Sequence, residues 1–187
     1  MSIVILGWGS LIWDPRDLPR EGVWQLAGPR LGVEFSRVSQ DGRLTLVIDL
    51  ADGVPVGTRY VLSPRTLISD AIEDLAKREG TLKKKIGFVD LKALNTSAGH
   101  AADQAAPCQT ISASCEQRQL HGAVWTALSP NFQKETGKAF SVDNAVAYLK
   151  SLPKGARSVA LHYIESAPEE VITPVRTAVM ADIDRLR

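Results

Sequence analysis

The first residues of the chain join an apolar run to a glycine-rich turn. Residues 3–6 are Ile-Val-Ile-Leu, a pattern typical of a buried strand, and residues 7–11 follow as Gly-Trp-Gly-Ser-Leu. Glycine has no Cβ, so it adopts backbone angles closed to other residues and lets a ligand approach the main chain. Consecutive N–H groups in such a turn can converge on an anionic oxygen, and a serine adds a hydroxyl. The turn predicts a binding edge, with a plain strand-to-loop bend as the alternative. Its predicted ligand-contacting residues are Gly7, Trp8, Gly9, Ser10 and Leu11.

A second candidate for chemistry is a glutamate on a predicted helix. Ile68, Ile72 and Leu75 follow the i, i+4, i+7 spacing of a core-facing stripe, and one further step of four reaches Glu79. Burying an ionised carboxylate without partners is costly. Glu79 is therefore expected to be paired, turned outward at the last helical turn, or placed in a pocket. Arg78, although adjacent in sequence, is expected to point elsewhere on the helix.

Both candidates match motifs of one known superfamily. Residues 7–15, Gly-Trp-Gly-Ser-Leu-Ile-Trp-Asp-Pro, resemble the Tyr-Gly-Ser signature of the γ-glutamylcyclotransferase superfamily. They are most similar to its glutathione-specific, ChaC-type branch, in which the motif continues as Leu-Ile-Trp. Trp8 stands where the family usually has tyrosine. The Asn that follows Ser in the main branch is absent, as it is in the ChaC-type branch.

The resemblance extends to the glutamate. In this superfamily the catalytic glutamate follows a β-rich segment and lies near the end of a helix, and in the ChaC-type branch arginine precedes it. Arg78-Glu79 fits that position, after residues 57–62, which resemble the family's Gly-x-x-Tyr strand. The resemblance covers roughly residues 3–92. It implies an α+β, γ-glutamylcyclotransferase-like fold, with a small mixed β-barrel or strongly curved sheet and peripheral helices.

The implied reaction needs no protein nucleophile, because a γ-glutamyl compound carries its own α-amine. The enzyme folds the substrate so that this amine attacks the γ-carbonyl, and it moves one proton to the leaving amine. Glu79 would act first as general base and then as general acid, while residues 7–11 hold the polar head or polarise the carbonyl. The products are 5-oxoproline and an amine, without a metal or organic cofactor.

The γ-glutamyl donor, glutathione or another peptide or amine, stays open. Two other functions also stay open. One is a non-catalytic ligand-binding or regulatory domain of the same fold, and the other is a γ-glutamyl transferase or hydrolase acting on a different donor.

Composition sets wider limits. A chain of 187 residues that is 44% hydrophobic is long enough for one core, which predicts a single domain over residues 1–187. The net charge of +1 argues against nucleic acid or an acidic membrane as the main partner, and the lysine run at 83–85 is too short to change that. No apolar stretch approaches the ~20 residues of a membrane span. We expect a cytoplasmic protein with a small-molecule γ-glutamyl partner; the oligomeric state is not predicted.

Turn and cap signals predict the remaining elements. Asp-Gly pairs at 41–42 and 52–53 predict hairpins that join the strands into a meander. Residues 95–118 are predicted as a long loop. The predicted strands are 3–6, 32–38, 43–50, 54–62, 120–128 and 158–164. The predicted helices run from the Ser63-Pro64 cap to Gly80, from Ser141 to about Leu152, and from Thr173-Pro174 onward.

The remaining reactive residues are predicted to be structural. Cys108 and Cys115 are six residues apart in a polar segment and are expected to be ordinary thiols. A metal site with His100 is disfavoured because no further ligands follow at zinc spacing. His121 and His162 are placed in strands as hydrogen-bonded structural groups.

Overall fold

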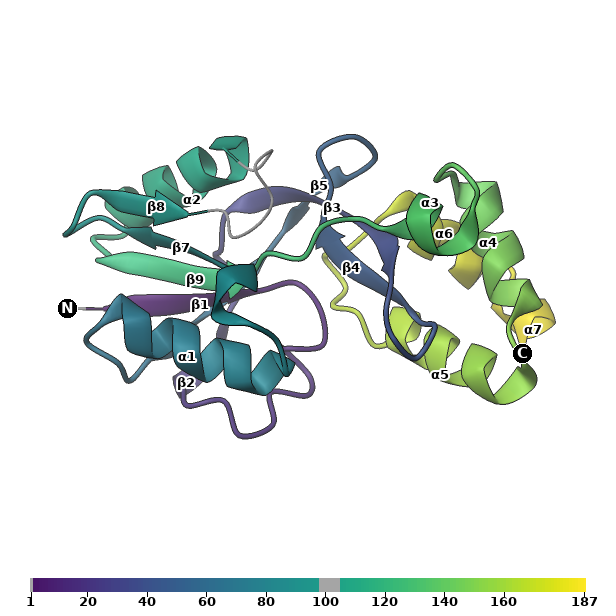
Figure 1. The fold of residues 1–187 in the computed structure, drawn as a ribbon, viewed down its shortest axis with the longest axis horizontal. Helices are drawn as coiled ribbons and strands as arrows, with labels where there is room; N and C mark the ends of the chain where they lie inside the picture. Colours follow the sequence, from purple (N-terminus) through teal and green to yellow (C-terminus); the bar gives the residue numbers. More distant parts are fainter. Residues whose placement is uncertain (1, 98–104) are drawn as a thin grey trace. The chain divides into compact units, whose positions relative to one another are not determined.

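The computed structural model describes residues 2–97 and 105–187. Its internal contacts divide the chain into two compact units. Unit 1 comprises Met1–Leu31 and Gly57–Leu128, and unit 2 comprises Gly32–Val56 and Ser129–Arg187. Figure 1 shows the elements of both, and each unit is described by itself. The prediction of a single domain over residues 1–187 stays a prediction.

Unit 1 is built on a six-stranded mixed sheet with the strand order β2-β6-β1-β9-β7-β8. β1 lies inside this sheet, antiparallel to β6 and parallel to β9. All five residues of β1 are buried, as the apolar sequence predicts. The strands are β1 (Ile3–Gly7), β2 (Glu21–Gln25), β6 (Arg59–Ser63), β7 (Ile86–Asp90), β8 (Asn95–Ser97) and β9 (Gly122–Thr126).

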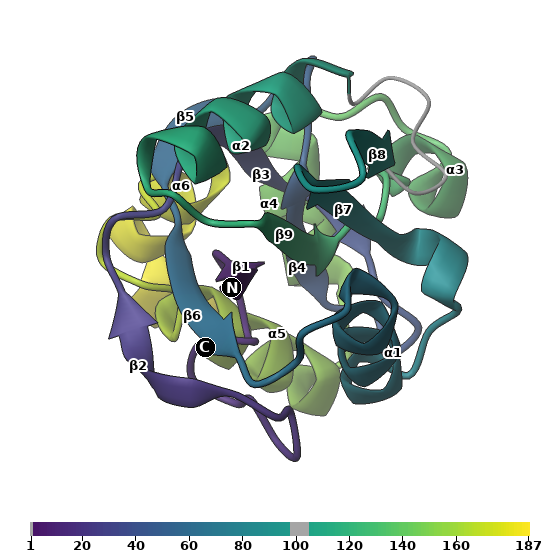
Figure 2. The ribbon, with the colours of Figure 1, turned by 90° about the vertical axis from the view of Figure 1, so that its left-hand side faces the viewer.

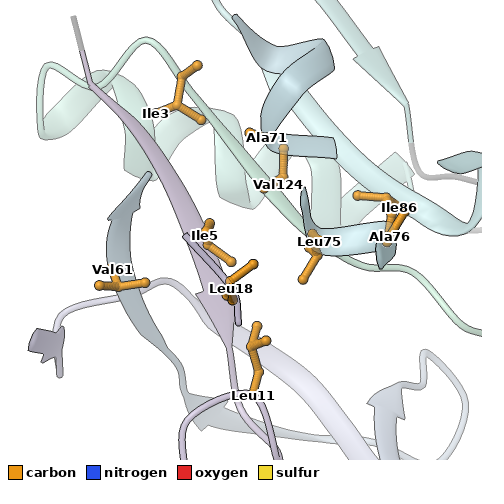
Figure 3. Close-up of a cluster of buried hydrophobic side chains, with 10 residues drawn as sticks. All are labelled: Ile3, Ile5, Leu11, Leu18, Val61, Ala71, Leu75, Ala76, Ile86 and Val124. Atoms are coloured by element: carbon orange, nitrogen blue, oxygen red, sulfur yellow. The ribbon is translucent and has the colours of Figure 1, made fainter. Parts of the chain in front are cut away.

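Two helices cover this sheet, and a short 3-10 turn, η1 (Lys83–Lys85), precedes β7. Helix α1 (Ile68–Glu79) packs on Ile3 and Ile5 of β1 in a buried apolar cluster (Figure 3). Helix α2 (Ala105–Gln117) lies on a different side of β9 from α1 (Figure 2). Residues of β1 alternate between the two sides, because successive strand side chains point to opposite faces.

The start of α1 differs from the prediction, and its end agrees with it. Ser63 is the last residue of β6 and pairs with Ile3, so it does not cap the helix. Its hydroxyl accepts from the backbone N–H of Arg65 at 3.2 Å, in a turn that precedes the helix. Gly80 ends α1 at φ 61°, the left-handed conformation that favours glycine.

The sheet of unit 2 has the order β4-β3-β5, with β3 (Arg30–Val38), β4 (Leu44–Ile48) and β5 (Val54–Gly57). The first predicted hairpin is confirmed, because β3 and β4 pair antiparallel and Gly42 has φ 81° in their turn. The predicted meander is wrong, since β5 lies on the other side of β3 from β4. The predicted strand 54–62 is also wrong as one strand, because β5 and β6 belong to different sheets.

The helices of unit 2 confirm two predicted caps. The Ser141 hydroxyl accepts from Asn144 N–H, and that of Thr173 accepts from Arg176 N–H with Pro174 following the cap. The helices are α3 (Phe132–Thr136), α4 (Val142–Ser151), α5 (Lys154–Glu165), α6 (Pro174–Ala181) and α7 (Ile183–Leu186).

Two predicted elements are wrong in kind. Residues 158–164 lie in α5, not in a strand, and the buried residues Ala160, Leu161 and Ile164 follow helical spacing. The predicted loop 95–118 contains β8 and α2; its residues 98–104, with His100, lie outside the described residues.

The described chain is a mixed α+β fold with two sheets and several helices. A closed barrel, one of the predicted alternatives, is not formed by the described strands, because β2 and β8 are open edges of the larger sheet. Within residues 2–97 and 105–187, no helix is long and apolar enough to cross a membrane.

Gly87 and Gly155 make a matched pair for testing the packing of unit 1. Gly87 of β7 lies opposite Trp125 of β9, and a Cβ on Gly87 would overlap the buried indole ring. We expect Gly87→Ala to lower the free energy of unfolding by about 1–3 kcal/mol. Gly155→Ala, in the first turn of α5 where a Cβ meets nothing within 4 Å, should raise it by about 0.4–1 kcal/mol. Urea denaturation checks both, and equal effects would contradict the packing argument.

Glu34 of β3 provides a pH-dependent test of unit 2. Its fully buried carboxylate accepts from the N–H groups of Phe35, at 2.7 Å, and Val175, at 3.2 Å. Burial outweighs these bonds and, with a contribution from Asp49, raises the pKa of Glu34 above 4.5. A raised carboxyl pKa gives a contribution to stability that is complete below pH 4.5 and is lost as pH rises through the folded-state value.

We therefore expect the stability of the wild type relative to Glu34→Gln to be greater near pH 4.5 than at about pH 7.5. Urea unfolding at the two pH values measures the difference. A pH-independent gap between the two proteins would contradict the assignment.

Candidate active site

The turn after β1 is closed by its own backbone. Ile12 N–H donates to the Gly9 carbonyl at 3.0 Å, and Asp14 N–H donates to the Ser10 carbonyl at 2.8 Å. Gly9 and Ser10 are partly exposed. Leu11 is buried in the apolar cluster of unit 1 (Figure 3), so its side chain serves the core.

The need for glycine at position 7 comes from packing. A Cβ on Gly7 would lie 3.1 Å from the Trp24 ring and 3.2 Å from the Ile12 side chain. Among the described residues, neither Gly7 nor Gly9 is one of the glycines with positive φ. The turn therefore does not use the left-handed conformation that favours glycine. Trp8 is also buried, with 5% of its surface exposed.

Glu79 is the last residue of α1 and is held by its neighbour. Arg78 Nη1 donates to Glu79 Oε1 at 2.6 Å. The Arg78 side chain is 4% exposed and that of Glu79 is 19% exposed. Of the three arrangements expected for Glu79, the structure has the paired one. The expectation that Arg78 points elsewhere is wrong, because its long side chain reaches back to the carboxylate where the helix ends.

Arg78 also connects the end of α1 to the loop that follows the glycine-rich turn. Its Nη2 donates to the backbone carbonyl of Asp14, and Arg16 Nη1 donates to the Arg78 carbonyl at 3.4 Å. Leu11 and Leu18 from the same loop pack in the cluster with the α1 residues. The structure thus brings the glutamate-bearing helix end and the N-terminal loop into contact.

The third resembling segment lies beside the first one. β6 runs antiparallel to β1, with Gly7 opposite Arg59 and Leu6 opposite Tyr60. The strand leading into the glycine-rich turn and the Gly-x-x-Tyr segment are therefore hydrogen-bonded neighbours. The sequence motifs for strand, turn and helix end converge within unit 1.

Sequence reasoning missed Arg78, Asp14 and Arg16 as members of this cluster. The only local signal was the charge of Arg78 next to Glu79, and helical periodicity assigned that charge to another side. The contact to Asp14 is made across 64 positions of sequence, and no local pattern encodes it.

A small pocket of unit 1 lies against other residues. Neither Glu79 nor residues 7–11 line it. The Arg118 guanidinium lies over the Tyr60 ring at its rim, 5.6 Å from the ring centroid. Its apolar lining includes Val4 and Leu6 of β1 and Ile111 and Cys115 of α2.

The histidines and cysteines lie away from Glu79 in the contacts they make. His121 Nδ1 accepts from Ser2 N–H at 3.0 Å, and His121 N–H donates to the Ser2 carbonyl at 2.9 Å, just before β9. His162 is exposed on α5, where a strand was predicted. Among the described residues, no three His, Cys, Asp or Glu side chains gather in a way that could hold a metal ion.

Comparisons with protein-family models, with curated proteins and with solved structures returned no match.

The two cysteines give a test of this part of unit 1. Cys108 and Cys115 are free thiols buried on one side of α2, and burial raises the pKa of Cys115 to about 11. Because the thiolate is the reactive form, we expect both to react with a disulfide reagent at pH 8 at least ~10-fold more slowly in the folded protein than in urea. Absorbance of the released thiolate follows the reaction. Equal rates in both states would contradict their burial.

Proposed function

We propose that this protein is a γ-glutamylcyclotransferase-like enzyme. It cleaves a γ-glutamyl peptide or amine, with glutathione as one candidate, by attack of the substrate's own α-amine on its γ-carbonyl. The products are 5-oxoproline and the released amine. The proposed setting is the cytoplasm, with a small-molecule substrate and without nucleic acid, metal or cofactor.

The observation that carries the proposal is the connection made by Arg78 between Glu79 and the loop after the glycine-rich turn. The proposed reaction needs a proton acceptor beside a site that binds the amino-acid head. The two sequence motifs that resemble the superfamily supply these parts, and they are in contact in unit 1. Glu79 keeps part of its surface exposed, as a group that exchanges protons with a substrate must.

In the proposed mechanism the ionised Glu79 accepts a proton as the α-nitrogen attacks the γ-carbonyl. It then returns that proton to the leaving nitrogen when the γ-amide bond breaks, so the carboxylate is regenerated and no net proton is consumed. The partly exposed main chain at Gly9 and Ser10 would bind the substrate's polar head or the carbonyl oxygen. Trp8, larger than the usual tyrosine, would influence which donor is accepted.

The second candidate function is a non-catalytic ligand-binding domain. It is favoured by the ion pair itself, because a carboxylate joined to a buried guanidinium also serves as a purely structural link between α1 and the loop. Such a protein would bind γ-glutamyl compounds without releasing 5-oxoproline.

Replacing Glu79 tests the enzyme proposal. Purified protein is assayed for 5-oxoproline release on glutathione, γ-glutamyl dipeptides and γ-glutamyl amines. Glu79→Gln keeps the shape of the side chain but removes the proton acceptor, so turnover should fall by at least ~10²-fold while the fold persists.

The matched control is Glu73→Gln on the same helix. Glu73 is exposed and pairs with Lys83 at 2.7 Å, so its loss should leave turnover within about twofold of the wild type. Near-normal turnover in Glu79→Gln would refute the role of Glu79. Ligand binding without 5-oxoproline release in the wild type would favour the non-catalytic candidate.

A further inference from the structure

Arg78 is an unusual residue to bury at the end of a helix. Its side chain is 4% exposed, and its guanidinium makes two separate contacts, one to the Glu79 carboxylate and one to the Asp14 carbonyl. A buried cation is tolerated only where acceptors replace its hydration. The Glu79 carboxylate and the Asp14 carbonyl accept from Nη1 and Nη2, whereas Nε, also buried, has no hydrogen-bond partner among the described residues.

The backbone around Glu79 does little to fix the orientation of its side chain. α1 ends directly after it, with Gly80 N–H bonded to the Lys77 carbonyl and Thr81 N–H bonded to the Ala76 carbonyl. Adjacent helical residues diverge by about 100° around the axis, so a glutamate at this point would otherwise sample several rotamers. Arg78 Nη1 donates a hydrogen bond of 2.6 Å to Glu79 Oε1, which restricts these rotamers.

We infer that Arg78 is the positioning residue of the proposed reaction: it holds the Glu79 carboxylate in a fixed orientation beside the N-terminal loop. This inference rests on the proposed function. Arg78 is not itself placed in contact with substrate. It acts through Glu79, by orientation, and through Asp14, by holding the loop at a fixed distance from the helix end.

The geometry requires a guanidinium rather than an ammonium. Nη1 and Nη2 lie in one rigid plane and donate hydrogen bonds in two directions, to Glu79 and to Asp14. A lysine supplies the charge as a single point on a flexible chain. Arg78→Lys therefore separates the effect of charge from the effect of geometry.

A structural role alone makes a different prediction. If Arg78 only joins α1 to the loop, its removal lowers stability and leaves the kcat of the folded enzyme unchanged. If it also orients Glu79, its removal lowers the kcat of the folded enzyme with little change in KM. The split between kcat and KM is thus the decisive measurement.

The test compares Arg78→Lys, Arg78→Met and the control Arg65→Met in the full chain. Arg65 forms an exposed ion pair with Asp74 of α1 at 2.6 Å, away from Glu79. For Arg78→Met we expect a ~10–100-fold fall in kcat with KM within about threefold. Arg78→Lys should restore only part of kcat, and Arg65→Met should change neither kcat nor KM.

Two results would overturn the inference. One is wild-type kcat in folded Arg78→Met, with or without the raised KM that a merely structural residue gives. The other is full recovery of kcat in Arg78→Lys. If Arg78→Met does not fold, Arg78→Lys decides on its own, because wild-type kcat in that variant contradicts the need for a two-directional donor.

A readout without turnover separates this inference from the proposed function. Absence of 5-oxoproline from every substrate would defeat the proposed function. Arg78 is then tested by NMR relaxation of the ¹³C-labelled Glu79 side chain, which should become more mobile in Arg78→Met, or in Arg78→Lys to a lesser extent if the first variant does not fold. Unchanged mobility would overturn the inference, whatever the fate of the enzyme proposal.

Discussion

The burial of one guanidinium, that of Arg78, constrains the part of unit 1 that surrounds the candidate site. A charged group removed from water needs acceptors with fixed geometry, and removing one partner of such a set is strongly destabilising. Two of the three guanidinium nitrogens of Arg78 meet this demand, with a carboxylate from its own helix and a carbonyl from the loop after β1, while Nε is buried without a partner among the described residues. The end of α1 and the path of residues 9–16 are therefore not independent. Whatever fixes one also fixes the other.

The elements that sequence reasoning predicts well are those whose signal is local. The apolar run at the N-terminus is a buried strand because all its side chains pack in apolar surroundings. Gly80, Ser141 and Thr173 mark helix ends because each satisfies backbone groups within four residues of itself. The closeness of Glu79 to the N-terminal loop was available only through the family resemblance, since α1 and β1 are far apart in sequence.

The failures arise where the deciding interaction is distant. Residues 158–164 contain β-branched and aromatic side chains that favour a strand, yet their buried positions fit a helical face, and tertiary packing decides. The order β4-β3-β5 depends on where β5 finds an open edge, which two similar Asp-Gly turns do not encode. Ser63-Pro64 is a typical start of a helix, but Ser63 pairs with Ile3 and is therefore part of the sheet.

The position of the candidate site follows from the complete burial of β1, whose side chains are apolar on both faces. Ile3 and Ile5 pack against α1, and Val4 and Leu6 line the pocket beside α2, so this strand offers only apolar side chains on both of its faces. Polar function near β1 must then come from the main chain beyond the strand and from groups brought to its end. Gly9, Ser10 and Glu79 are partly exposed at such ends, where the backbone leaves a strand or a helix. Because both faces of the central strand are apolar, reactive groups are confined to the ends of strands and helices. A single buried arginine can hold two of these ends together.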